Sequence, residues 1–142
     1  MKTMVIVHCS ATPPDMDIGT KEIRAWHVRG NGWRDIGYNY VLRRSGALEG
    51  GRDLDNDGDF DEEIGAHAKG FNTQSIGICL VGGIDSDGNP ECNYTIGQMI
   101  GLSNLVDRIR RDNPSILIVG HHDVNPGKAC PCFNVKELLG EL

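Results

Sequence analysis

The sequence lacks any apolar run long enough to cross a membrane, and it lacks a surplus of positive charge. A membrane-spanning helix needs about 20 consecutive apolar residues, so we expect no insertion into a bilayer. Lys and Arg number 14 against 20 Asp and Glu, a formal net charge of −6. This balance disfavours nucleic acid, or an anionic surface, as a partner held by bulk electrostatics.

A secretion signal is missing as well. The N-terminal segment MKTMVIVHCSATPP has one lysine and a short apolar run, without the longer apolar region and small-residue cleavage site of a signal peptide. We therefore expect synthesis in the cytoplasm, and any work outside it requires help to cross the membrane. Internal repeats, low-complexity tracts and linkers are also absent. A chain of 142 residues can bury a hydrophobic core, so we expect a single domain over residues 1–142.

The cysteines are odd in number, which disfavours a disulfide framework in a chain without a secretion signal. Metal binding or plain burial is the better expectation for them. Cys79, inside SIGICLVGG, is expected to be a small buried hydrophobe, and Cys92 to have no role. The five are Cys9, Cys79, Cys92, Cys130 and Cys132.

Short apolar runs predict strands at residues 4–9, 75–81 and 115–120. A fourth strand at 38–44 turns at Ser45 and Gly46 into the segment ALEGG, which is typical of a hairpin. Helical patterns predict a short helix at 20–30, which ends at Gly30, and a final helix at 134–142. Strands interleaved with helices around one sheet indicate an α/β fold.

The longest helix is predicted between Thr95, its natural N-cap, and Pro114, which stands beyond its end. Apolar residues recur at steps of three and four, so one face is expected to pack on the core. They are Ile96, Met99, Leu102, Val106 and Ile109.

The stretch GHHDVNPGKACPCF (120–133) contains several side chains that can bind metals. His121 and Cys130 lie in one loop, and His8, at the end of a strand, provides a third candidate. Neighbouring side chains of a strand point to opposite faces, so Cys9 is expected to face the core and His8 the other side. Two imidazoles, one thiolate and an open fourth position are typical of catalytic zinc. Two alternatives stay open: a closed structural site completed by Cys132 or His122, and a buried, inert Cys130.

Five blocks occur in order along the chain: VHCSAT, EIRAWH, GWRDIGYNYVLRR, GAHAKGFNTQSIGICLVGGID and HHDVNPGKACPCF. Together they resemble the zinc-dependent N-acetylmuramoyl-L-alanine amidases, in the superfamily shared with peptidoglycan recognition proteins. The nearest likeness is to the amidase-type lysozymes of T-odd coliphages. The resemblance runs from about Val5 to Leu139 and implies a central mixed β-sheet flanked by helices.

The resemblance implies a role for seven residues. His8, His121 and Cys130 match the zinc ligands, with His122 outside the ligand set. Tyr38 and Lys128 match the catalytic residues. Positions that line the substrate groove correspond to His67 and Asn72.

The implied reaction is zinc-assisted hydrolysis of the amide between N-acetylmuramic acid and L-alanine in peptidoglycan. Lys128 would stabilise the oxyanion as a point charge, and Tyr38 would position water or carry a proton. We expect a monomer that acts on the cell wall after release. The alternatives are a peptidoglycan-binding module without turnover, whose expected sign is a missing cysteine ligand, and a cysteine hydrolase using Cys9.

The segment 52–64, RDLDNDGDFDEEI, is longer and more acidic than the resemblance predicts. Asp53, Asp55, Asp57 and Gly58 fit the opening of an EF-hand calcium loop, but its twelfth position holds Ile64 instead of glutamate. A solvated acidic loop is therefore preferred over a weak calcium site.

Overall fold

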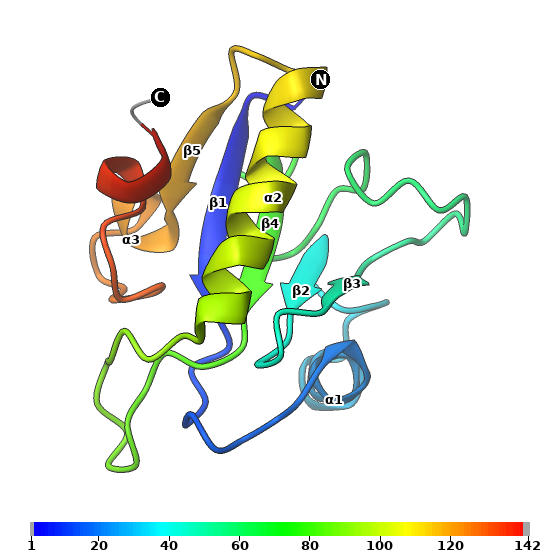
Figure 1. Cartoon of the computed structure of the whole chain (residues 1–142). Helices are drawn as coiled ribbons and strands as arrows, with labels where there is room; N and C mark the ends of the chain where they lie inside the picture. Colours follow the sequence, from blue (N-terminus) through cyan, green and yellow to red (C-terminus); the bar gives the residue numbers. More distant parts are fainter. Residues whose placement is uncertain (1, 141–142) are drawn as a thin grey trace.

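Five strands form one mixed sheet in the computed structural model, which describes residues 2–140. The strands are β1 (Met4–Cys9), β2 (Tyr40–Leu42), β3 (Leu48–Gly50), β4 (Ser75–Leu80) and β5 (Leu117–Gly120). Their order across the sheet is β3-β2-β4-β1-β5, with every neighbouring pair parallel except the β2–β3 hairpin. The expected α/β fold with a central mixed sheet is confirmed (Figure 1).

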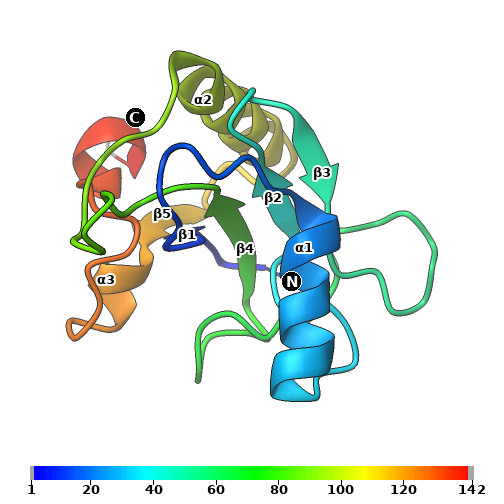
Figure 2. The same ribbon diagram turned by 90° about the horizontal axis from the view of Figure 1, so that it is seen from below.

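Helices cover both faces of this sheet. Seen from below, α2 (Ile96–Asp112) lies on one face, whereas α1 (Thr20–Ala25) and its continuation η1 (Trp26–Gly30) lie on the other (Figure 2). Alternation along the strands explains the division, because Val5 and Val7 pack with the α2 side while Ile6 lies in a separate cluster on the opposite face. No helix among the described residues is both long and apolar enough to span a membrane.

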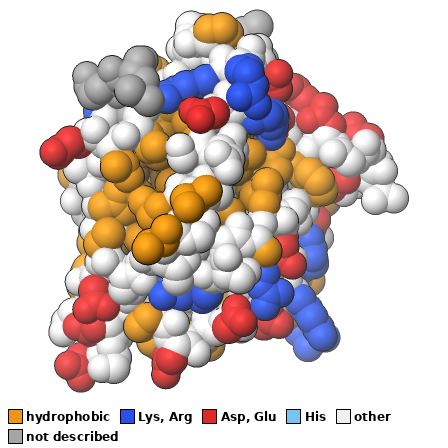
Figure 3. All heavy atoms as spheres, viewed as in Figure 1, with side chains coloured by type: hydrophobic (Ala, Val, Ile, Leu, Met, Phe, Trp, Pro, Cys, Tyr) orange, Lys and Arg blue, Asp and Glu red, His pale blue; other side chains and the backbone are white. Residues whose placement is uncertain are grey.

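Helix α2 begins as expected, because the Thr95 hydroxyl accepts a hydrogen bond from the Gln98 backbone N–H at 3.0 Å. The expected apolar face is correct for Leu102, Val106 and Ile109, which are buried, but wrong for Ile96, whose exposed fraction is 81%. Gln98 is buried near that end of the helix. Its amide donates to the backbone carbonyls of Leu42, in β2, and of Val81, which follows β4. Figure 3, which views the molecule from the α2 side, shows hydrophobic side chains at the surface. Ile96 is one of the exposed hydrophobic residues of α2.

Several element boundaries differ from the expected ones. The strand predicted at 38–44 is limited to Tyr40–Leu42, because the chain departs from regular pairing on either side. Before the strand, the Tyr38 carbonyl accepts the backbone N–H of Arg52, and after it the chain turns at Ser45. The final helix predicted at 134–142 is a short turn, η2 (Lys136–Gly140), and residues 141–142 lie outside the described part.

The ends of β1 and β5 define where a site can form. The two strands are parallel and Val7 pairs with Gly120, so the C-terminal ends of both meet at one edge. A short helix, α3 (His121–Val124), follows β5 without an intervening loop. Active sites of open α/β sheets lie at this kind of edge.

Candidate metal centre

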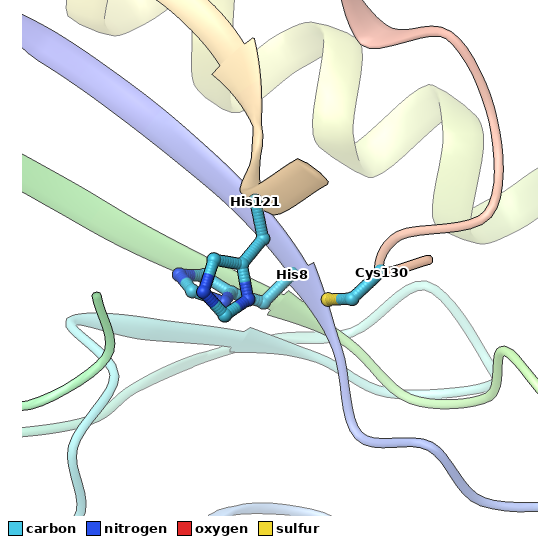
Figure 4. A group of neighbouring side chains, drawn as sticks. All are labelled: His8, His121 and Cys130. Atoms are coloured by element: carbon cyan, nitrogen blue, oxygen red, sulfur yellow. The ribbon is translucent and has the colours of Figure 1, made fainter. Parts of the chain in front are cut away.

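Three side chains from separate elements converge at this edge: His8, His121 and Cys130. Each offers one ligand atom, and these atoms all lie within 4.8 Å of one another. Figure 4 shows His8 at the end of β1, His121 just after β5 and Cys130 on the loop beyond, with its sulfur directed toward the two rings. The structure thus brings together the three residues that the sequence singled out as ligands.

Three hydrogen bonds hold the cysteine loop in place. The backbone N–H of Cys9 donates to Cys130 Sγ at 2.9 Å, and the N–H of His122 donates to the Cys130 carbonyl at 2.9 Å. The Tyr94 hydroxyl donates to the carbonyl of Pro131 at 2.6 Å. These three bonds attach the loop to the end of β1, to α3 and to the segment before α2, so the sulfur position depends on residues far apart in sequence.

The imidazoles of the centre are held in the neutral form that metal binding requires. Burial is the main cause that lowers the pKa of His8 well below its ordinary value, and the nearby His67 and His121 rings lower it further. Burial also lowers the pKa of His67 to about 3. The pKa of His121 is lowered by burial and then by the nearby charge of Lys128. A neutral imidazole keeps a lone pair on one ring nitrogen, which is the electron pair a metal ion needs.

The thiols of Cys9 and Cys130 shift each other's pKa. The hydrogen bond from Cys130 lowers the pKa of Cys9 to about 6. The Cys9 side chain and burial raise the pKa of Cys130 in the metal-free protein, opposed by the N–H of Cys9. A cation between the ligands would favour the thiolate of Cys130. Cys9 is only 7% exposed, which leaves it poorly placed to attack a polymeric substrate.

The remaining cysteines and His122 lie outside the cluster. All five cysteines, each within the described residues, are free thiols. Cys79 is fully buried, as expected, and Cys92 is exposed. Cys132 Sγ donates to the Gly83 carbonyl at 3.3 Å, and the His122 ring lies 3.6 Å from an Asp123 carboxylate oxygen. Neither supplies a fourth ligand in the described part of the chain.

Tyr38 lies beside the cluster. Its ring centroid is 5.3 Å from that of His8 and 5.5 Å from that of His27. Burial, followed by the surrounding cysteines, raises the pKa of Tyr38 well above its ordinary value, so its phenol keeps the proton at neutral pH. His27 accepts the Gly37 N–H at 2.9 Å and thereby supports the turn that precedes Tyr38.

A groove of about 370 Å³ opens next to the cluster. Lys128, His121, His67 and Asn72 all line it, so these four side chains are within reach of one bound molecule. The Asn72 amide oxygen also accepts the backbone N–H groups of His67 and Ala68, both at 2.9 Å. Asn72 therefore shapes the wall of the groove as well as lining it.

Sequence reasoning did not single out three other polar or aromatic residues that line the groove. They are Trp33, Lys69 and Asn125. An available signal was their position inside the blocks GWRD, GAHAKG and HHDVNPG that carry the family resemblance.

The acidic loop folds back on itself away from this groove, and Figure 3 shows its acidic side chains gathered at the upper right. Oxygens of Asp53, Asp55, Asp57 and Glu63 lie within 4.8 Å of one another. Asp53 accepts the backbone N–H of Asp57 and of Gly58, which accounts for the turn by internal hydrogen bonds. Farther along the loop, Asp61 forms an ion pair with Arg108, which attaches the loop to α2. A solvated loop therefore remains the preferred interpretation.

Comparison with known proteins gives consistent matches over nearly the whole chain. The family described as N-acetylmuramoyl-L-alanine amidase matches residues 2–133. The endolysin of Enterobacteria phage K11 is 48% identical over 138 residues, covering 96% of this chain and 85% of that protein. The endolysin of Escherichia phage T7 is 43% identical over 132 residues, covering 93% and 82%. Among solved structures, the N-acetylmuramoyl-L-alanine amidase LysC from Clostridium intestinale is 25% identical with a TM-score of 0.76, covering 97% and 85%.

Proposed function

The chain belongs to the N-acetylmuramoyl-L-alanine amidase family, and we propose that it cuts peptidoglycan with the help of a zinc ion held by His8, His121 and Cys130. Its reaction is hydrolysis of the amide bond between N-acetylmuramic acid and L-alanine, in the manner of a phage endolysin. The observation that carries the zinc proposal is the convergence of three ligand atoms within 4.8 Å.

The donor set fits zinc. Two imidazole nitrogens and one thiolate are ligands that zinc accepts in catalytic sites, where three protein groups leave a fourth position open. The Cys9 N–H directed at Cys130 Sγ favours the thiolate form, because a hydrogen bond to the charged form stabilises it. When bound, zinc would supply Lewis acidity, polarising the scissile carbonyl and lowering the pKa of a water to about 7.

Tyr38, beside the cluster, and Lys128, in the groove, would complete the chemistry. The protonated phenol of Tyr38, beside the His8 ring, is a donor that can orient the substrate carbonyl or pass a proton at its Oη. Lys128 is exposed, lines the groove and lies close enough to His121 to lower its pKa. Its ammonium can stabilise the oxyanion that forms when the amide carbonyl becomes tetrahedral.

The groove would provide recognition, with His67 and Asn72 in its wall. We further propose that residues 1–142 act as one amidase domain and as a monomer. In this proposal the chain is made in the cytoplasm and reaches the wall only after release. Neither nucleic acid nor insertion into a membrane has a part in the reaction.

Mass spectrometry of digestion products tests the bond and the cofactor together. Purified peptidoglycan is incubated with metal-free protein and, in parallel, with zinc-restored protein. We expect stem peptides beginning with L-alanine, released only when zinc is present. Intact glycan–peptide linkages under both conditions would instead support a binding module without turnover. Release without zinc that is blocked by thiol alkylation would support a cysteine hydrolase.

A further inference from the structure

A chain of hydrogen bonds leads away from the metal centre through the interior. His8 Nε2 lies 2.8 Å from His67 Nδ1, and His67 Nε2 lies 3.2 Å from Ser75 Oγ. Ser75 Oγ in turn donates to the backbone carbonyl of Phe71 at 2.6 Å. Ser75 is fully buried and His8 is 2% exposed, so water has little access to the two ends of this chain.

When both imidazoles are neutral, only one arrangement of donors and acceptors satisfies all of these hydrogen bonds. A carbonyl oxygen can only accept, so the single hydroxyl proton of Ser75 points at Phe71. Ser75 Oγ must then accept from His67 Nε2, which places the His67 proton on that nitrogen. The other nitrogen of His67, Nδ1, has no proton and must accept from His8 Nε2.

We propose that Ser75 and His67 are positioning residues that hold His8 in the tautomer with its proton on Nε2, leaving Nδ1 to bind the metal. Metal-binding histidines commonly donate their second ring N–H to a partner that orients the ring. Here that partner is itself oriented, by a serine anchored on a backbone carbonyl. The metal part of this inference rests on the proposed function, whereas the tautomer is a property of the protein alone.

Strand β4 leaves room for the His67 ring and so for the relay of hydrogen bonds from Ser75 through His67 to His8. Side chains alternate along a strand, so Ser75 and Gly77 lie on the same face of β4. A Cβ at Gly77 would lie 2.5 to 2.7 Å from atoms of the His67 ring, closer than real contacts allow. The missing side chain therefore forms the slot in which the ring lies. Asn72 holds the backbone of His67 from the other side.

Nitrogen-15 NMR of the metal-free protein reads the tautomers directly. We expect His8 and His67 both to carry their proton on Nε2 in the wild type. In Ser75→Ala, His67 Nε2 loses its acceptor, so we expect His8 to populate both tautomers. A His8 protonated on Nδ1 in the wild type, or an unchanged His8 tautomer in Ser75→Ala, would overturn the proposal whether or not the protein binds zinc.

Zinc affinity, measured by competition with a chromophoric chelator, is the second readout. Loss of such outer partners typically weakens metal binding by about 10–100-fold, and we expect this range for Ser75→Ala and His67→Leu. His67→Asn keeps an acceptor oxygen near the Nδ1 position, so we expect it to recover most of the affinity. Ser45→Ala is the matched control, because it also removes a bonded hydroxyl, in the remote β2–β3 turn.

Thermal unfolding of the metal-free variants separates positioning from folding. If Ser75→Ala is too unstable for titration, the comparison of His67→Leu with His67→Asn still decides. Equal zinc affinity in those two variants would contradict the relay. If neither the wild type nor any variant binds zinc, the proposed function fails, and the NMR result still tests the tautomer on its own.

Discussion

His8 and Cys9, neighbours at the end of β1, illustrate how single residues acquire their roles. Strand alternation separates their side chains, so His8 faces the cluster that includes the His121 ring while Cys9 is buried near Gly83. Cys9 nevertheless contributes to the centre through its backbone N–H, which donates to Cys130 Sγ. The pattern in the sequence predicts the separation of the side chains, whereas the backbone contribution of Cys9 has no sequence signal.

Replacing the candidate cysteine ligand tests the proposed metal centre at the residue scale. We expect Cys130→Ser to lose zinc and activity together, because a hydroxyl is a poor substitute for a thiolate. The loss of affinity should exceed the roughly 10–100-fold typical of an outer partner. Cys132→Ser is the matched control, since Cys132 lies outside the cluster; zinc content by atomic absorption compares the two. Full zinc retention by Cys130→Ser would make the ligand assignment wrong.

Lys128 provides a contrasting prediction. Lys128→Ala should keep zinc but lose rate, by roughly 10²–10³-fold in kcat if the ammonium stabilises the oxyanion. Lys21→Ala, an exposed lysine of α1 outside the groove, removes the same charge and should leave kcat unchanged. Steady-state kinetics on a soluble muramoyl-peptide measures both. A Lys128 variant with raised KM and normal kcat would assign Lys128 to binding instead.

Helix α2 shows what happens at the scale of an element. Its start at Thr95 and its buried Leu102, Val106 and Ile109 were predictable from the sequence, because capping and helical periodicity are local properties. Ile96 fits the same periodicity, yet it is exposed, and buried Gln98 bonds to β2 and to the carbonyl of Val81 instead. Which apolar residues of a helix are covered depends on how far the sheet extends beneath it.

The Thr95 cap can be measured on its own. Thr95→Ala removes the acceptor for the Gln98 N–H and the donor to the Arg44 carbonyl. We expect the free energy of unfolding to fall by about 1 kcal/mol. Asn104→Ala, at an exposed position of the same helix, should not destabilise, because alanine has the higher helix propensity. Urea unfolding at neutral pH compares the two, and an unchanged stability of Thr95→Ala would argue against the capping role.

At the scale of the whole molecule, buried neutral histidines make stability depend on pH. The pKa values of His8 and His67 are lowered in the folded, metal-free protein, mainly by burial. Unfolded histidine has a pKa of about 6.5, so below that pH the unfolded chain binds protons that the folded one does not. Stability is therefore fully present above about pH 6.5 and falls as the pH decreases toward about 3, the pKa of folded His67.

The expected slope is up to roughly 1.4 kcal/mol per pH unit for each histidine. Urea unfolding of metal-free protein at several pH values between about 7.5 and 5 measures it. His67→Asn should reduce the slope by about one histidine's share. A stability that rises on acidification in this range would contradict the neutral, buried state of both rings.

The sequence by itself determined the main elements, the family and the candidate ligands, because strand alternation, helix capping and ordered motifs are all carried by residues near one another in the chain. Only the tertiary structure decided what surrounds those ligands. Parallel pairing of β1 with β4 and β5 brings His8, Ser75 and His121 to one face, although more than 60 residues separate His8 from either of the others. Hydrogen bonds such as that from Cys9 to Cys130, and the slot over Gly77 for His67, arise from this convergence. A contact between distant segments depends on how they pack, and no local pattern records it.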